Sequence, residues 1–305
     1  MTDLSGRIGG WLYQQPYLLL AITYFTWGVN LVIGRYAVGH IPPMALTWLR
    51  WGLAFLIVLP FAWPHLKRDW PAIRSRPVLM TALAVIGTTG FNAIAYWALH
   101  YTQSINAMLI QATSPLMVAL VGFAIFRDRL TTAQALGILT SFVGVAIILC
   151  RGDFAVLRAV DFNRGDTWFV VAMTLFAIYA VLLRKRPKMH PASFLAFTMG
   201  WGTLWLTPVL LWEMSSGAVP IFDLKTVFVL AYSAVFPSVV AYVCYNRGVE
   251  LVGSNRAAAL YPLIVVFGSV VAIPMLGETP QLFHAIGYVL VFAGVIVATR
   301  GPRAT

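Results

Sequence analysis

The stretch 104–148, SINAMLIQATSPLMVALVGFAIFRDRLTTAQALGILTSFVGVAII, decides the fold because a weaker copy of it follows 150 residues later, at 254–298. Each copy holds two long apolar segments separated by a short polar break that carries one carboxylate. Small and acidic residues coincide without a gap: Ser104 with Ser254, Ala107 with Ala257, Asp128 with Glu278, Gly137 with Gly287 and Gly144 with Gly294. A repeat of this length indicates an architecture of two related halves.

The composition places the chain in a membrane. Of its 305 residues, 60% are hydrophobic and 10% are charged, whereas an ordinary soluble chain carries about 25% charged residues. So few charges cannot cover a water-facing surface, and we expect the lipid bilayer to be the solvent. The net charge of +11 would suggest nucleic acid in a soluble protein. Here the basic residues lie between apolar segments, so topology explains them and no nucleic-acid partner is expected.

Ten apolar segments are long enough to cross ~30 Å of hydrocarbon. They are predicted at 16–36, 43–63, 78–99, 104–126, 132–150, 166–184, 191–213, 226–247, 254–276 and 280–299. Five segments fall in each half, which predicts a first repeat at 16–150 and a second at 166–299. The fold expected is an all-α integral membrane protein of ten transmembrane helices.

The distribution of Lys and Arg predicts the orientation. With the N-terminus inside, 15 of the 21 basic residues fall in cytoplasmic pieces and 5 in outer pieces, which places both termini in the cytoplasm. The first fifteen residues lack the features of a signal peptide, and the apolar run after them is long enough to span. Because each half holds an odd number of spans, the second half must be inverted relative to the first. Inverted repeats are typical of secondary transporters, which rock one half against the other around a midplane site.

Two polar stripes follow the same offset of 150 residues. Each has an i, i+4, i+8 spacing, which places its members on one face of a helix. The stripes are Thr88, Asn92 and Tyr96 in the third segment and Ser238, Tyr242 and Asn246 in the eighth. Polar groups inside a span need a partner or a water-lined cavity. We expect the paired stripes to line a substrate cavity, although bonding between helices would account for any single member.

Gln111 and Tyr261 coincide under the repeat, and each precedes a proline within its span, Pro115 and Pro262. A proline inside a helix frees the carbonyl one turn earlier, here at Gln111 and at Ala258. Spans interrupted by proline at corresponding positions of two halves indicate a transport site.

Further candidates are Trp27 and Asn30 in the first segment and Tyr179 in the sixth. A tryptophan can also be an interfacial anchor, which fits Trp11, Trp63, Trp70 and Trp168. Arg50 is the charged residue that lies well inside a span, ~10 Å below its outer end. Its guanidinium could meet a substrate carboxylate, bond to backbone carbonyls, or extend to the surface. Its repeat mate is Gly200, so the site would be asymmetric.

Several chemistries lack the residues they need. All ten Asp and Glu fall in tails, loops or span ends, so none can act as a proton or sodium relay within the membrane. Paired carboxylates for Mg²⁺, a His cluster for a transition metal and a GxxxxGK[ST] loop are all absent from the sequence. Cys150 and Cys244 have no metal or redox spacing and are interpreted as small hydrophobes. We therefore expect no cofactor, no metal and no enzyme activity.

The motifs of the two halves resemble the EamA family of the drug/metabolite transporter superfamily. The first half carries Trp27-Gly28, Arg50, Tyr96 with Ala98-Leu99, Pro115, Asp128 and Gly137/Gly144, and the second carries Tyr245-Asn246-Arg247-Gly248, Pro262, Gly277-Glu278 and Gly287/Gly294. The loop acid of the family is usually Glu, where this chain has Asp128. The first-span motif is missing from the second half, which has Phe176-Ala177 instead. Within the family, the chain is most similar to the YddG-type amino-acid exporters of bacterial inner membranes.

This resemblance implies export of aromatic and other neutral amino acids, with the small-molecule substrate and the bilayer as partners and no obligate protein partner. Under the inversion, Tyr96 would close the outer side of the site, and Tyr245 with Asn246 the inner side. A multidrug carrier of the same superfamily remains the alternative. A nucleotide-sugar carrier would need more intramembrane cations than Arg50, and a membrane-embedded enzyme would need a catalytic pair.

Overall fold

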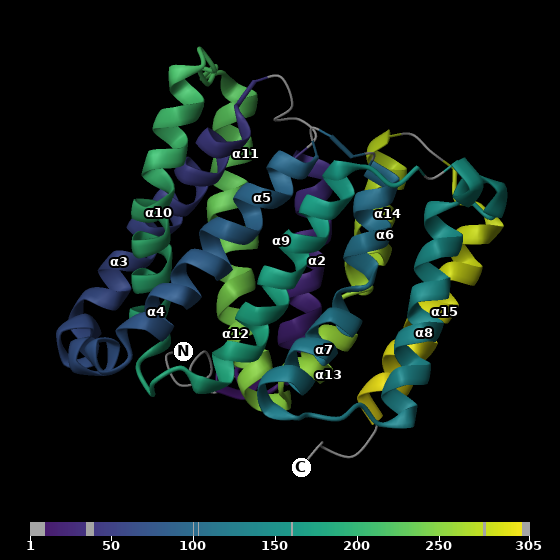
Figure 1. Cartoon of the computed structure of the whole chain (residues 1–305), viewed down its shortest axis with the longest axis horizontal. Coiled ribbons are helices and arrows are strands. Elements are labelled where there is room, and N and C mark those ends of the chain that lie inside the picture. Colours follow the sequence, from purple (N-terminus) through teal and green to yellow (C-terminus); the bar gives the residue numbers. More distant parts are fainter. Residues whose placement is uncertain are drawn as a thin grey trace, which may run out of the picture.

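The computed structural model describes residues 10–34, 40–99, 101–102, 104–159, 161–276 and 279–300. Every regular element in these ranges is a helix, and the helices stand side by side in one bundle (Figure 1). The predicted loop acid Glu278 and its neighbour Gly277 lie outside the described residues.

The helices of the two halves follow the predicted order. The first half contains α2 (Pro16–Gly34), α3 (Pro43–Ser75), α4 (Pro77–Ala84), η2 (Val85–Gly90), α5 (Phe91–Ala98), α6 (Ser104–Ala112), α7 (Ser114–Phe126), α8 (Thr132–Leu149) and the 3₁₀ turn η3 (Phe154–Ala159). The second half contains α9 (Arg164–Leu182), the 3₁₀ turn η4 (Leu183–Lys185), α10 (Pro191–Ser215), α11 (Leu224–Ala234), η5 (Val235–Val240), α12 (Ala241–Val252), α13 (Ser254–Ala259), α14 (Leu263–Leu276) and α15 (Leu282–Arg300). Within the described ranges, eight helices are long and apolar enough to cross a membrane, or nine when α6 and α7, bent by 47°, count as one span.

Polar side chains mark where several helices begin. Thr131 and Gln134 form a capping box at the start of α8, and Asn163 and Asp166 form another at the start of α9. Asp223 caps α11 by accepting the backbone N–H of Thr226 at 2.8 Å. These caps satisfy N–H groups that a helix leaves unpaired in its first turn.

Helix α3 is longer than the sequence predicts. Hydropathy ends the segment at residue 63, but the helix continues to Ser75 through two further prolines, Pro64 and Pro71. Its two ends are fixed to the antiparallel helix α10 by carboxylates. Glu213 accepts the backbone N–H groups of Met44 and Ala45 at 3.0 and 2.9 Å, and Asp69 accepts the backbone N–H of His190 at 2.9 Å. These tertiary contacts hold helical turns that hydropathy alone does not predict.

The glycines of α8 and α15 pack the two helices against each other. A Cβ on Gly137 would lie 2.5 Å from the carbonyl of Gly294, and a Cβ on Gly144 would lie 2.7 Å from the carbonyl of Gly287. These glycines therefore allow the two helices to pack closely. Because residue numbers rise along one helix while they fall along the other, α8 and α15 are antiparallel. These helices occupy corresponding places in the two copies. An inverted repeat requires such a pair of helices to run in opposite directions, as they do here.

Two π-helical turns interrupt the third and eighth segments. They cover Val85–Gly90 (η2) and Val235–Val240 (η5), and the bounds of one convert into those of the other by adding 150. A π-helical turn leaves the ordinary i to i−4 ladder and is frequent at functional sites. The two turns therefore mark the third and eighth segments as candidate parts of a functional site.

Candidate functional site

Aromatic rings from both halves surround Trp27 on α2. The centroid of its ring system lies 5.4 to 6.4 Å from those of five other aromatic side chains. These are Tyr24, Phe176, Tyr242, Tyr245 and Tyr261. Such separations are those of edge-to-face and tilted aromatic pairs. The rings fill the middle of the bundle by contacting one another.

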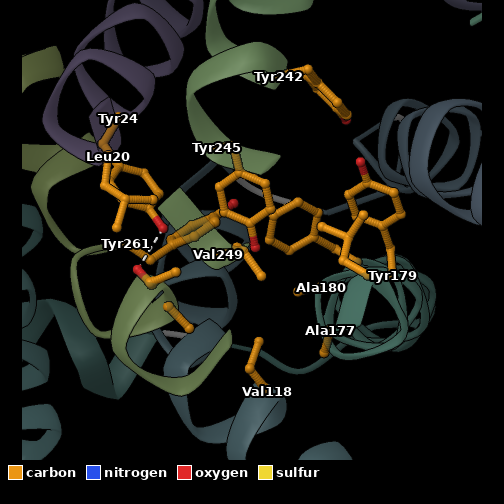
Figure 2. Close-up of a cluster of buried hydrophobic side chains, with 14 of the residues drawn as sticks. Leu20, Tyr24, Val118, Ala177, Tyr179, Ala180, Tyr242, Tyr245, Val249 and Tyr261 are labelled. Carbon is orange, nitrogen blue, oxygen red and sulfur yellow. Dashed lines mark hydrogen bonds between the residues drawn. The ribbon is translucent and has the colours of Figure 1, made fainter. Parts of the chain in front are cut away.

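The tyrosines of this aromatic centre are buried (Figure 2). Tyr24 and Tyr245 are fully buried, and Tyr179, Tyr242 and Tyr261 are at most 4% exposed. Figure 2 shows the rings of Tyr24, Tyr245 and Tyr179 in one buried cluster, carried by different helices. A solute can therefore reach this region only when the helices that carry the rings separate.

The phenol groups connect the two halves through hydrogen bonds. The Gln111 amide donates to the Tyr261 hydroxyl at 3.1 Å, and the Tyr242 hydroxyl donates to the carbonyl of Gly87 at 2.8 Å. Within the second half, Tyr179 donates to the side-chain oxygen of Asn246 at 2.9 Å.

The π-helical turns supply two matching carbonyl groups. Gly87 of η2 and Pro237 of η5 coincide under the offset of 150, and each carbonyl accepts a bond from the opposite half. The Gly87 carbonyl is taken by Tyr242, and the Pro237 carbonyl by the indole N–H of Trp27 at 3.0 Å. The Arg50 Nη2 group lies 3.4 Å from the same Pro237 oxygen. These reciprocal bonds join the halves at their centre.

Arg50 brings a positive charge to the edge of the aromatic centre. It is 5% exposed, its Nε donates to the Ser238 hydroxyl at 2.6 Å, and its guanidinium lies over the ring of Trp51 at 5.0 Å. Of the three roles left open by the sequence, extension to the surface is therefore excluded, and bonding to a backbone carbonyl is present. In the part of the chain that the structure describes, Arg50 has no carboxylate partner. A buried guanidinium without a counter-charge is costly and has an affinity for an anion.

Three interactions pair residues that are repeat mates of each other. Gln111 bonds to Tyr261, the side chain of Asn92 interacts with the Tyr242 hydroxyl, and Ser141 donates to the carbonyl of Val291 at 3.3 Å. In each pair the residue numbers differ by 150. Two equivalent positions can meet only on the axis that relates them, so these pairs mark the pseudo-two-fold axis. The axis passes through the aromatic centre.

Three buried polar atoms at the centre lack a hydrogen-bond partner among the described residues. They are the Tyr245 hydroxyl, the Asn246 amide nitrogen and the Trp51 indole nitrogen. An unpaired buried polar group costs about 1–3 kcal/mol, and each such group needs an explanation. All three are able to donate, so they are available to the acceptor atoms of a ligand.

The proline breaks differ in detail from the prediction. The first falls at Thr113, between α6 and α7, and the second at residues 260–262, between α13 and α14. The carbonyl of Ala258, which was expected to be free, accepts the backbone N–H of Tyr261 at 2.8 Å in the turn. The neighbouring carbonyl of Ala257 accepts the hydroxyl of Tyr24 at 2.6 Å.

Most of the predicted site residues meet at the aromatic centre or adjoin it. They are Trp27, Arg50, Asn92, Gln111, Tyr179, Ser238, Tyr242, Tyr245, Asn246 and Tyr261. Thr88 departs from its stripe, because its hydroxyl bonds to Ala84 in its own helix and lies 3.4 Å from the Thr198 carbonyl of α10. Asn30 accepts the Ser233 hydroxyl at 3.2 Å, and Tyr96 is half-buried on α5, one turn beyond Asn92.

Three residues of the centre were not singled out by sequence reasoning: Tyr24, Trp51 and Phe176. The sequence contains a spacing that indicates two of them. Tyr24 precedes Trp27 by three residues and Phe176 precedes Tyr179 by three, a spacing that places both members of each pair on one helix face. Trp51 is adjacent to Arg50, and its ring lies 5.0 Å from that of Tyr242.

Ion pairs link loops and helix ends at the end of the bundle where α2 begins and α15 ends, which we call the basic end (Figure 1). Arg184 pairs with Asp128 of the first half, and Glu250 accepts from Arg186 at 2.8 Å and lies 3.2 Å from Arg247. Across the described ranges, no group of three His, Cys, Asp or Glu is arranged to hold a metal ion.

Helices of membrane length, in two copies related by an axis through a central site, are typical of secondary transporters. The sequence profile of the EamA-like transporter family matches residues 14–150 and 163–300. The chain belongs to this family. It is therefore a multi-pass membrane transporter and not an enzyme.

Relatives that match more than nine tenths of the chain support the assignment. The chain is 29% identical to the uncharacterized transporter YyaM of Bacillus subtilis, over 92% of each protein, and 30% identical to an uncharacterized transporter of Archaeoglobus fulgidus, over 94% of this chain and 98% of that protein. It is 26% identical to a probable amino-acid metabolite efflux pump of Salmonella typhimurium, over 95% of this chain and 96% of that protein. A solved crystal structure superposes with a TM-score of 0.76 over 93% of this chain and 96% of that chain at 16% identity, which shows the fold alone.

Proposed function

We propose that the protein exports small neutral or zwitterionic metabolites, most of all aromatic and other neutral amino acids, by alternating access. The observation that carries this proposal is the buried Arg50 guanidinium, which adjoins a cluster of aromatic rings and has no acid to neutralise it among the described residues. The efflux pump of Salmonella typhimurium, whose name concerns amino-acid metabolites, supports the same substrate class.

Each part of an amino acid has a matching group in the site. The planar guanidinium of Arg50 can bind a carboxylate with two parallel hydrogen bonds, in exchange for the Ser238 hydroxyl and the Pro237 carbonyl. The aromatic rings offer apolar contacts to the side chain and their faces to the ammonium group. The unpaired Tyr245 hydroxyl and Asn246 amide can donate to carboxylate oxygens.

The proposed membrane arrangement has ten spans, five in each repeat, with repeats at 16–150 and 166–299. The basic end would face the cytoplasm, because basic residues are retained on that side of a membrane. Both termini would then be cytoplasmic, and the protein would reside in a bacterial inner membrane.

In this arrangement the structure corresponds to a state closed toward the cytoplasm. Tyr245 and Asn246 form the inner closure with Tyr179, and the ion pairs of the basic end lie beyond them. Tyr96 forms the outer closure in the opposite state. A substrate drives the exchange when it binds the intermediate, occluded state more tightly than either open state. No acid lies in mid-span to carry a proton, so we propose export down the gradient of the substrate.

Uptake of radiolabelled phenylalanine into proteoliposomes tests the proposal. We expect saturable uptake, with at least a tenfold loss in Arg50→Gln and in Gln111→Ala. The control is Thr207→Val, which removes an intramembrane bond from Trp48 at 3.1 Å outside the aromatic centre and should transport normally.

A cationic dye added as competitor separates amino-acid export from multidrug export. Uptake of the dye itself, with no uptake of phenylalanine, would favour the multidrug carrier. Normal phenylalanine transport in both Arg50→Gln and Gln111→Ala would refute the site.

A further inference from the structure

The last turns of α3 present a stripe of four exposed residues, which we call the α3 stripe. Trp63, Lys67, Trp70 and Arg74 follow one another at intervals of four, three and four residues, so they lie on one face of the helix. Trp63 is 62% exposed and Trp70 is 45% exposed. Aromatic and basic side chains alternate along the stripe.

The two cations of the stripe differ from their neighbours in having no protein partner within the described ranges. Arg68 lies 3.6 Å from the Asp69 carboxylate, and Arg76 donates to the carbonyl of Lys185 at 2.9 Å. Lys67 and Arg74 make no ion pair, hydrogen bond or ring contact there and are exposed. Their charges are therefore available to an external anion.

The opposite face of this part of α3 is fixed to the protein. Asp69 accepts the backbone N–H of His190 at 2.9 Å, and the rings of His65 and His190 stack with centroids 3.8 Å apart. Ile73 is buried on the same side. Since the inner face is held, the α3 stripe presents its four side chains from a rigid helix and not from a flexible loop.

The position of the stripe is that of a membrane surface. At ~1.5 Å per residue, the 33 residues of α3 extend for ~50 Å, whereas the hydrocarbon layer is ~30 Å thick. The final turns of the helix therefore reach the headgroup region at the basic end. In Figure 1 this part of α3, in dark blue, lies at the lower left edge of the bundle, next to the start of α4.

We propose that the α3 stripe binds the headgroup of an anionic phospholipid. Lys67 and Arg74 would contact the phosphate and its neighbouring oxygens, because clustered basic residues next to a span attract anionic lipids. Trp63 would lie at the level of the glycerol backbone, where tryptophan is favoured, and Trp70, two turns further along the helix, would lie beside the headgroup. The alternation fits a lipid better than an acidic protein segment, since a single lipid offers both an anion and an apolar body beside the helix.

Native mass spectrometry of the full chain in a neutral detergent tests this site. The protein is titrated with phosphatidylglycerol and with phosphatidylcholine of the same acyl chains. We expect wild-type protein to retain phosphatidylglycerol in preference, and Lys67→Gln/Arg74→Gln to bind it about tenfold more weakly with phosphatidylcholine binding unchanged. The charge-preserving variant Lys67→Arg/Arg74→Lys should behave as the wild type. Glycerol phosphate is added as a competitor. It should displace phosphatidylglycerol only weakly from a site for lipid headgroups, whereas it would displace the lipid strongly from a site for free phosphates.

The matched control is Arg129→Gln/Lys188→Gln, which removes two exposed charges from the same end without a neighbouring tryptophan. Equal loss in this control would overturn the proposal in favour of general electrostatic attraction. Equal affinity of Lys67→Gln/Arg74→Gln and the wild type would overturn it directly, as would displacement of the lipid by an acidic peptide at equimolar concentration. If the double variant does not fold, each single variant should show a partial loss, and the absence of any loss in both would count against the site.

Discussion

Replacing Tyr242 with phenylalanine should shift the protein away from the conformation described above. The change removes the buried hydrogen bond from the Tyr242 hydroxyl to the Gly87 carbonyl, which joins the two halves at 2.8 Å. A neutral hydrogen bond of this kind contributes about 1 kcal/mol net. At about 1.4 kcal/mol for each factor of ten, its loss changes the ratio of the two end states about fivefold.

The pseudo-two-fold axis predicts the matching effect in the opposite state. When the two halves exchange roles, the counterpart of Tyr242 is Asn92 and the counterpart of Gly87 is Pro237. The Asn92 amide, which now donates to the Thr88 carbonyl at 2.8 Å, should then donate to the Pro237 carbonyl. Asn92→Ala should therefore shift the ratio of states in the direction opposite to Tyr242→Phe.

Thiol accessibility at the basic end measures this ratio. Asn255 lies where it would contact a Cβ on Gly122 of the first half, at 3.5 Å, so it should become accessible when the basic end opens. The reporter is Asn255→Cys in a background in which Cys150 and Cys244 are replaced by alanine. It is labelled from the basic side with a membrane-impermeant maleimide. We expect the labelling rate to rise about fivefold in Tyr242→Phe and to stay level or fall in Asn92→Ala.

A matched control removes a tyrosine hydroxyl that does not join the halves. Tyr288→Phe breaks a contact with Ser269 at 3.0 Å, and both residues belong to the second half. Its labelling rate should equal that of the reporter alone. Equal labelling rates in Tyr242→Phe and Tyr288→Phe would refute a role of the Tyr242 hydroxyl in holding this state. An equal rise in Asn92→Ala and Tyr242→Phe would refute the exchange of roles between the two residues.

Two further predictions concern stability. Gly144→Ala forces a Cβ to within 2.7 Å of the Gly287 carbonyl and should destabilise the protein by about 1–3 kcal/mol, seen as a lower Tm in detergent; Gly52→Ala, whose Cβ meets only a methyl group at 3.7 Å, should leave Tm unchanged. Burial and the neighbouring His65 ring hold the pKa of His190 below its usual value. The neutral ring is therefore favoured in the folded state, and its contribution is present above about pH 6.5 and lost as the pH falls. Tm should drop more between pH 7.5 and 5 in the wild type than in His190→Gln, and equal drops would contradict this.

The repeat and its packing could be predicted from sequence because they depend on identity at fixed offsets. Gly137 and Gly144 recur as Gly287 and Gly294, and the structure brings the four together across α8 and α15. The length of α3 could not be predicted in the same way. Its last turns contain prolines and charges that end an apolar segment, and they remain helical through contacts with α10 that only tertiary structure supplies.

The site was predicted in part for a similar reason. An i, i+4, i+8 spacing identifies a helix face, but it does not say which neighbour that face meets. Thr88 shares its face with Asn92, yet it lies against α10 because the π-helical turn η2 rotates the helix between the two residues. No residue preference identifies a π-helical turn in advance, so Gly87 and Pro237, whose carbonyls join the halves, were not among the predicted residues.

The same contacts explain how a nearly symmetric scaffold can hold an asymmetric substrate. On the axis, Gln111 pairs with Tyr261 and Asn92 with Tyr242. Because the two members of each pair hold equivalent positions, exchanging the halves brings the same two residues together again. These two pairs can persist in both end states and so form a part of the site that does not change. Arg50 has glycine as its repeat mate, and therefore one end of the site carries a charge that the other lacks. A zwitterion held by this charge keeps one orientation while the scaffold inverts around it, so Arg50→Gln should weaken substrate binding.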